Sequence, residues 1–186
     1  LTGVSVSGAV IGGDSTGGLA GYLSGGNLGQ SASAVSVQGS NDTGGLVGKL
    51  ENDVNIIQSY SLGDVGGAGN VGGLVGYLLN GTITDSYARG SVSGNDTVGG
   101  LVGSAGSATI TFNNGYTYRS YSTGLVSGTG SSVGGLIGLL TRGSAADSYW
   151  DTETSGQTSS SGGAGVVGKT TAEMQQQATY AHYNFY

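Results

Sequence analysis

The pentapeptide Gly-Gly-Leu-Val-Gly at residues 72–76 decides the fold of this 186-residue chain, because it returns along the sequence with only its fourth residue changed, to Ala or Ile. Successive copies begin 27, 28, 27 and 35 residues apart. A nearly fixed period of this length is typical of solenoids, in which each structural unit stacks on the one before it. The five copies begin at Gly17, Gly44, Gly72, Gly99 and Gly134.

A second phrase, Ser-Tyr, follows the pentapeptide and keeps the same period. It begins 14 or 15 residues after the first glycine in three units but 21 residues after Gly99, which predicts an insertion near residues 106–118. In the first unit Ser31-Ala32 stands at this place, so the repeat favours the tyrosine without requiring it. The copies are Ser59-Tyr60, Ser86-Tyr87, Ser120-Tyr121 and Ser148-Tyr149.

The alternation of side chains along a strand predicts which repeat positions face the interior. If the first glycine of each pentapeptide is position 0, then Leu at +2, Gly at +4 and the mostly Leu position +6 share one face. We predict that this face is buried, and that residues at +3 and +5, such as Val75 and Tyr77, lie on the solvent side. The leucines at +2 are Leu19, Leu46, Leu74, Leu101 and Leu136.

Each unit is expected to contain two or three short strands, and no helical period occurs before residue 170. The second strand is expected over residues 83–87 and a third, shorter one at Val92. The sequence therefore predicts an all-β fold, a parallel β-helix (β-solenoid) of about five coils of 27–28 residues. The repeated glycines are expected to allow sharp turns with positive φ and a close approach of neighbouring coils.

The repeat pattern ends near residue 169. Thr170 and Glu173 have the spacing of a capping box, which predicts a short helix over about residues 171–178, followed by an aromatic-rich tail. An open β-helix end exposes apolar core and unpaired strand edges, so a helical tail is expected to cover it. We therefore divide the chain into solenoid repeats at residues 1–168 and a C-terminal capping segment at residues 169–186.

The composition argues against several classes of function. Eleven acidic and five basic residues give a formal charge of −6, which disfavours binding to nucleic-acid phosphates. No stretch approaches the ~20 apolar residues of a membrane-spanning helix, so no membrane insertion is expected in this segment. The chain has no cysteine and begins at Leu1 in the middle of a repeat, which predicts a segment of a longer protein.

The repeat resembles the GLUG motif, through Gly-Gly-Leu-Val-Gly and the stretch Ile-Thr-Asp-Ser-Tyr-Ala-Arg-Gly-Ser-Val-Ser-Gly at residues 83–94. Residues 148–157 and 168–174 resemble the segment that often closes such an array. The motif occurs in large secreted bacterial surface proteins, including filamentous-haemagglutinin-like adhesins and the non-catalytic part of IgA-specific metallopeptidases. The resemblance implies a secreted or cell-surface location and a structural role.

Candidate catalytic residues are few, and we predict that the chain is not an enzyme. The single histidine, His182, lies in the predicted capping segment, and the sequence has neither cysteine nor a His-Glu-x-x-His zinc site. Asp85, Asp147 and Asp151 recur at or near Ser-Tyr and could act as paired carboxylates. A recurring aspartate is more often a turn or strand-edge residue, so no catalytic residue is assigned.

Turn residues before the pentapeptide raise the questions of calcium and glycans. Asp14, Asp42 and Asp96 could supply oxygen ligands for calcium, but the third and fifth units have Asn and Ser at this place. Asx-turn chemistry explains these side chains without a metal, so no cofactor is predicted and calcium remains the alternative. Three sequons would be glycosylation sites in a host that modifies them, at Asn41, Asn80 and Asn95.

These observations predict an extracellular structural or adhesive module that acts as a rigid spacer or filament segment. Its partners would be a host-cell or matrix protein or glycan, or further copies of the chain. Two alternatives stay open: a self-assembling extracellular filament subunit, and a β-helix that binds or processes carbohydrate. The side chains expected to contact a partner are Tyr22, Tyr77, Tyr116 and Tyr118.

Overall fold

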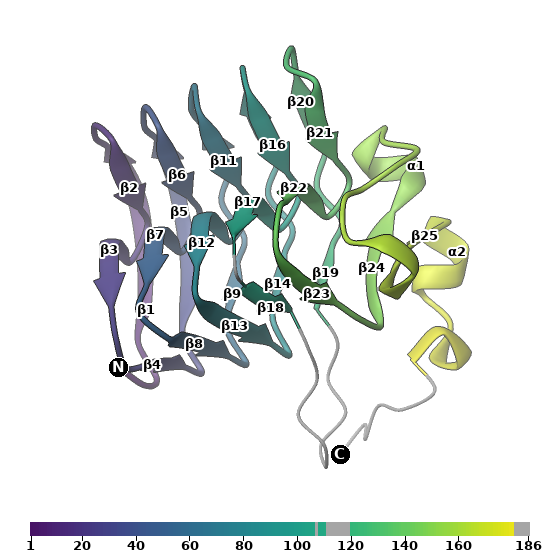
Figure 1. Cartoon of the computed structure of the whole chain (residues 1–186), viewed down its shortest axis with the longest axis horizontal. Helices are drawn as coiled ribbons and strands as arrows, with labels where there is room; N and C mark the ends of the chain where they lie inside the picture. The colour runs from purple at the N-terminus through teal and green to yellow at the C-terminus, as the bar shows by residue number, and fades with distance from the viewer. Residues whose placement is uncertain (107, 111–119, 181–186) are drawn as a thin grey trace.

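The computed structural model describes residues 1–106, 108–110 and 120–180, and they form a parallel β-solenoid of about five coils (Figure 1). This architecture confirms the predicted fold class. Each coil contributes one short strand to each of three five-stranded sheets and further strands to a ten-stranded sheet. The predicted insertion near residues 106–118 and the aromatic residues after Tyr180 lie mostly outside the described residues.

The three five-stranded sheets run the length of the array, and every strand pairing in them is parallel. The first contains β2 (Ser15–Gly17), β6 (Asp42–Gly44), β11 (Asn70–Gly72), β16 (Thr97–Gly99) and β21 (Ser132–Gly134). The second contains β3 (Ala20–Ser24), β7 (Val47–Glu51), β12 (Val75–Leu79), β17 (Val102–Gly106) and β22 (Ile137–Leu140). The third contains β4 (Asn27–Gly29), β8 (Val54–Ile57), β13 (Gly81–Thr84), β18 (Ala108–Ile110) and β23 (Gly143–Ala145).

The ten-stranded sheet divides into two arms that meet at a long strand, β5 (Ala32–Gln38), which also pairs with β1 (Ser5–Ile11). One arm contains β9 (Tyr60–Ser61), β14 (Tyr87–Ala88), β19 (Tyr121–Ser122), β24 (Ser148–Asp151) and β25 (Val166–Lys169). The other arm contains β10 (Val65–Gly66), β15 (Val92–Gly94) and β20 (Val126–Gly128). The remaining elements are the helices α1 (Thr152–Ser155), η1 (Gly163–Gly165), α2 (Thr171–Met174) and η2 (Gln177–Tyr180).

The pentapeptide sets the register between coils. The glycines that begin its five copies pair with one another in neighbouring strands of the first sheet, from Gly17 through Gly134. The leucines at +2 form the centre of the main hydrophobic cluster and are fully buried from Leu46 to Leu136. A smaller cluster, built mainly from valines such as Val37, Val65 and Val92, fills the opposite end of each coil.

The residues at +3 correct one prediction. Val75 and its equivalents were expected on the solvent side, but Val47, Val75, Val102 and Ile137 are fully buried in the main cluster. The chain bends between +2 and +3, where the amides of Leu74 and Val75 both donate to the carbonyl of Leu101, at 2.9 and 3.1 Å. Because the bend resets the alternation of side chains, both residues beside it point inward.

The glycines of the pentapeptide provide close approach without positive φ. A Cβ atom on Gly100 would lie 2.2 Å from the carbonyl oxygen of Gly135 and 2.8 Å from Ser122 Oγ. Among the described glycines, those with positive φ lie outside the pentapeptides, as at Gly25 and Gly26. The expectation of positive φ in the pentapeptide was therefore wrong. Its second glycine is required because the backbone of the next coil and a side chain across the interior leave no room for a Cβ atom.

The strand expected over residues 83–87 is two strands, β13 and β14, separated by a corner. Asp85 at this corner has a left-handed φ of 56°, and Gln58 and Asp147 occupy the same conformation in their coils. The serine after each corner builds a column that we call the serine ladder. Ser86 Oγ donates to the carbonyl of Thr84 and accepts from the amide of Ser59, at 2.8 and 3.1 Å. The ladder consists of Ser31, Ser59, Ser86, Ser120 and Ser148, and all five are buried.

The C-terminal end replaces the repeat with helices (Figure 1). The predicted capping box is present, with Thr170 as the N-cap of α2. The helix is shorter than expected, because it ends at Met174 and the chain continues through the separate 3-10 turn η2. Within the described ranges, no helix has the length and apolar character that crossing a lipid bilayer requires.

Candidate functional site

A row of stacked tyrosines runs along the outside of the ten-stranded sheet. The Ser-Tyr phrase places Tyr60, Tyr87 and Tyr121 in register on neighbouring strands. Their ring centroids are 4.9 and 5.0 Å apart, with interplanar angles of 3° and 5°. We call these three residues the tyrosine stack. Its inner ring, that of Tyr87, has both faces covered by neighbours, so a ligand can reach only the ring edges.

An arginine lies beside the stack, two residues after Tyr87. Strand alternation directs Arg89 outward like Tyr87, and its Cζ atom lies 5.3 Å from the centroid of the Tyr87 ring. Arg89 Nη2 also donates to Tyr121 Oη at 3.5 Å. Burial raises the pKa of the Tyr87 hydroxyl, Tyr121 adds to the rise, and the charge of Arg89 opposes it. The guanidinium therefore lies beside the stack, close to the Tyr87 ring, and donates one hydrogen bond to Tyr121.

Tyr180 covers the far end of the tyrosine stack. Its ring packs edge-on against Tyr149, with centroids 5.9 Å apart, and at 55° to the ring of Tyr121 at 6.3 Å. Burial raises the pKa of Tyr180 to about 12. This aromatic contact brings the last described residue of the chain to the face that carries Arg89.

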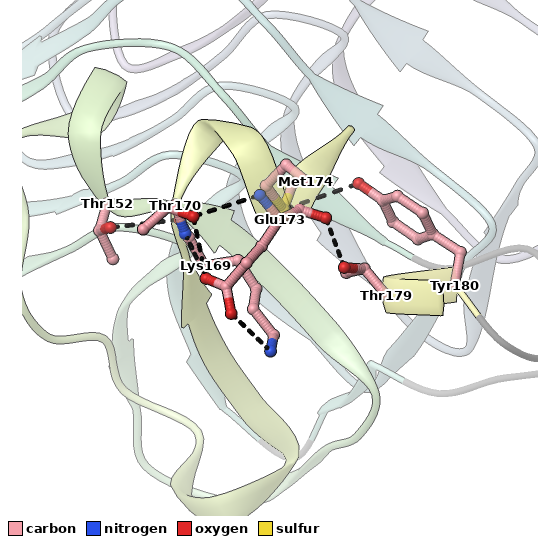
Figure 2. A network of polar contacts seen from close by, with 7 residues as sticks. All are labelled: Thr152, Lys169, Thr170, Glu173, Met174, Thr179 and Tyr180. Atoms are coloured by element: carbon pink, nitrogen blue, oxygen red, sulfur yellow. Dashed lines mark hydrogen bonds and ion pairs between the residues drawn. The ribbon is translucent and has the colours of Figure 1, made fainter. Parts of the chain in front are cut away.

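A network of polar contacts holds Tyr180 in this position (Figure 2). The carboxylate of Glu173 accepts from the amide of Thr170 at 2.8 Å and from Lys169 Nζ at 3.4 Å. These contacts lower the pKa of Glu173. Thr179 Oγ1 donates to the carbonyl of Glu173, and Tyr180 Oη lies 3.6 Å from the sulfur of Met174 (Figure 2). Thr179 and Tyr180 therefore tie the turn after α2 to the last two residues of the helix.

Asp151 joins the two short α-helices. Its side chain is buried, and Oδ1 accepts from the amides of Glu153 and Thr154 at 2.9 and 3.1 Å, which makes Asp151 the N-cap of α1. Oδ2 accepts from Thr171 Oγ1, in the first turn of α2, at 2.7 Å. Asp151 thus serves as a structural bridge, which the sequence analysis did not predict.

These groups surround a hollow of about 570 Å³ between the tyrosine stack and the helices, which we call the C-terminal groove. Its cation is Arg89, and its apolar side is made by Tyr121, Met174 and Tyr180. Its other polar groups come from Thr123, Asp151, Thr154, Thr171 and Gln175. The groove therefore combines the few polar groups and the apolar wall that are typical of small-molecule sites.

Two of the predicted contact residues, Tyr22 and Tyr77, lie on either side of one lysine. Lys49 Nζ is 5.9 Å from the ring centroid of Tyr22 and 5.8 Å from that of Tyr77. Glu51 accepts from Tyr22 Oη at 2.8 Å and pairs with Lys49 at 2.7 Å. Because of these hydrogen bonds the pKa of Glu51 is lowered and that of Lys49 is raised. The polar groups of this cluster are therefore engaged with one another.

The other predicted sites are spread over the molecule. Asp85 and Asp147 are corner residues of different coils, whereas Asp151 caps α1. The described residues contain no group of three or more acidic or imidazole side chains able to hold a metal ion. Asp14 and Asp42 accept from asparagine side chains of the following coil, at 2.7 and 2.8 Å. Tyr116, Tyr118 and His182 lie outside the described residues, and the three sequon residues, Asn41, Asn80 and Asn95, are exposed.

The sequence analysis missed Arg89 as a candidate. Its signal was present in Ser-Tyr-Ala-Arg at residues 86–89, since strand alternation puts Tyr87 and Arg89 on one face. The proximity of Tyr180 could not be seen in this way, because it depends on the path of the chain after β25.

Fold and register define the molecule as a β-solenoid repeat module. Residues 67–93 match the family model of the GLUG motif, and this segment contains the pentapeptide at 72–76, Ser86-Tyr87 and Arg89. The match confirms the resemblance seen in the sequence and assigns the motif to one coil of the solenoid. Comparison with curated proteins and with solved structures finds no match.

Proposed function

We propose that this chain is an extracellular structural module, without catalysis of its own, that holds neighbouring parts of a surface protein in a fixed relation and presents its side faces to partners. The observation that supports this proposal is the in-register parallel pairing of all four sheets along the array. Residues at equivalent repeat positions pair from coil to coil, so bending at any one coil would break several ladders together.

The geometry favours stiffness over length. Coils in such a stack are about 4.8 Å apart, so five of them extend roughly 24 Å. A fully extended chain would cover that distance with about seven residues. A module that uses so many residues for so short a span presents mainly lateral surface, which is the part that an adhesive function would use.

Distance measurements between spin labels test this rigidity. The chain lacks cysteine, so single cysteines can carry labels without background. Ile11 and Leu125, both exposed and far apart in the array, form the long pair, and Leu62 with Leu125 forms a pair spanning fewer coils. We expect equally narrow distance distributions for both pairs. A distribution that broadens with the number of coils between the labels would contradict the proposal.

Self-assembly into filaments is a second candidate, which the edges of the first coil favour. The strands β2 and β3 each pair on one side only, so their outer edges can accept another strand, whereas the outer edge of β4 is already bonded to Leu1, Thr2 and Gly3. Growth of a filament by stacking needs an open edge at both ends of the subunit. Helices α1 and α2 follow the last strands of the ten-stranded sheet (Figure 1), which weighs against continued stacking there. Sedimentation over a range of concentrations separates a filament from a monomer.

A further inference from the structure

The C-terminal groove combines a cation, hydrogen-bonding groups and an apolar wall. We propose that it binds a monocarboxylated sugar, such as a uronic acid residue of a glycan, with Arg89 on the ligand carboxylate. This inference deepens the adhesive part of the proposed function by naming a ligand class for one lateral face.

Arg89 is the cationic group of the groove. A guanidinium has five N–H donors arranged to hold a carboxylate through two parallel hydrogen bonds. Within the described part of the chain, Tyr121 Oη is the one acceptor bound to this guanidinium, and that contact is long, at 3.5 Å. The side chain is exposed but held in place by its contact with the ring of Tyr87. Arg89 is therefore oriented, charged and able to donate to a ligand.

Asp151 is the acidic group of the groove. Its Oδ1 is occupied by two backbone amides, and its Oδ2 accepts one hydrogen bond, from Thr171 Oγ1. A carboxylate oxygen can accept a second hydrogen bond, so a hydroxyl of the ligand can donate to Oδ2. The groove therefore matches a ligand that carries both an anionic group and hydroxyl donors.

The apolar wall of the groove is made by Tyr121, Met174 and Tyr180. Tyr121 and Tyr180 meet at an angle, and Met174 lies below them with its sulfur 3.6 Å from Tyr180 Oη. The carbon-bound hydrogens of a pyranose ring can pack on such a wall, while Thr123 and Gln175 are placed to bind its hydroxyls. A volume of about 570 Å³ accommodates one or two sugar rings.

The net charge of the chain determines which anionic ligands the groove can bind. A formal charge of −6 repels polyanions, and a single guanidinium cannot offset many sulfate groups. We therefore expect a ligand with one carboxylate to bind and a sulfated polymer to bind poorly.

Calorimetric titration of the whole chain with methyl glucuronide and with methyl glucoside tests the proposal, because these ligands differ only in the carboxylate. We expect the glucuronide to bind with a Kd of about 1 mM and the glucoside about tenfold more weakly. Arg89→Gln should weaken glucuronide binding about tenfold. Arg89→Lys keeps the charge but loses the paired N–H donors of the guanidinium, so it should weaken binding by a smaller factor. Arg142→Gln is the matched control, since Arg142 is also exposed but does not line the groove.

Equal binding of the two sugars would overturn the proposal, as would equal glucuronide binding by the wild-type chain and Arg89→Gln. Absence of glucuronide binding at tens of millimolar, or a preference for dextran sulfate, would also overturn it. Circular dichroism of Arg89→Gln establishes that the coils remain folded. The spin-label distances do not depend on the groove, so the spacer proposal and the ligand proposal can fail separately.

Discussion

The inner coils and the C-terminal end fill and cover their interior in different ways. In the inner coils, the second glycine of the pentapeptide faces a small residue that follows Ser-Tyr across the interior, as Gly45 faces Ser61 and Gly100 faces Ser122. At the last coil this place belongs to Trp150, which is buried against Gly135 and donates from Nε1 to the carbonyl of Gln157 at 3.0 Å. An inner coil is covered by the next coil, whereas the last one requires side chains of its own.

This difference shows where specific chemistry can arise. The repeated rows consist of glycine, leucine, valine and serine that are packed closely inside the coils. The tyrosine stack ends where Tyr180 packs across it, and the C-terminal groove exists because the repeat stops there.

The largest effect is expected from a substitution that adds a side chain where an inner coil has no room for one. In Gly100→Val the new Cβ would lie 2.2 Å from a backbone oxygen that cannot move without its whole coil. We expect destabilisation of more than about 4 kcal/mol, with loss of the folded state in urea denaturation followed by circular dichroism. Gly13→Val is the control, since nothing lies within 4 Å of that position and its stability should change little. Similar stabilities of the two variants would show that the interior of the coil is not close-packed.

The second change makes the end resemble an inner coil. Trp150→Ser introduces the residue that Ser122 supplies one coil earlier, and it should cost about 3–5 kcal/mol because no following coil fills the space. Hydrogen exchange should show the loss confined to β24, β25 and the helices, with β7 and β12 still protected. Leu74→Ala should lower the free energy of unfolding by about 2–5 kcal/mol and move the loss of exchange protection to the central coils. A uniform loss of protection in Trp150→Ser would mean that the end and the inner coils unfold as one unit.

Two buried serines of neighbouring coils, Ser86 and Ser61, differ in their hydrogen bonding. Ser86→Ala removes the acceptor of the Ser59 amide, and leaving that buried donor unpaired should cost about 1–3 kcal/mol. Ser61 is also buried, but among the described residues its Oγ has no hydrogen-bond partner. Ser61→Ala should therefore leave stability unchanged or raise it. Equal losses in thermal melting of the two variants would contradict a specific role for the serine ladder.

Sequence reasoning succeeded where the repeat itself carries the structure. The spacing from Gly17 to Gly134 predicted the parallel register, and the pairing of those glycines confirms it. It failed at corners, because alternation assumes a straight strand and the bend at Leu74 and Val75 turns both side chains inward. It also could not place Tyr180 beside Arg89, since that contact depends on the path of a non-repeating segment. The architecture is thus local and periodic, whereas the groove is a tertiary feature.

The smallest expected effect is a pH response confined to the C-terminal end. Burial raises the pKa of Tyr180 from its ordinary value near 10 to about 12, so the folded state keeps this proton after the unfolded state has lost it. The resulting stabilisation is fully present below pH ~10 and is lost as the pH rises through about 12. Because the ring remains partly exposed, the loss should be modest and should loosen only the contact of η2 with the tyrosine stack. Absorbance titration of tyrosine ionisation in the wild-type chain and in Tyr180→Phe measures it, and the variant should lack the late-ionising step. Burial also raises the pKa of Tyr87. If both chains keep the late-ionising step, Tyr87 would be its source and the C-terminal end would not be the pH-sensitive region.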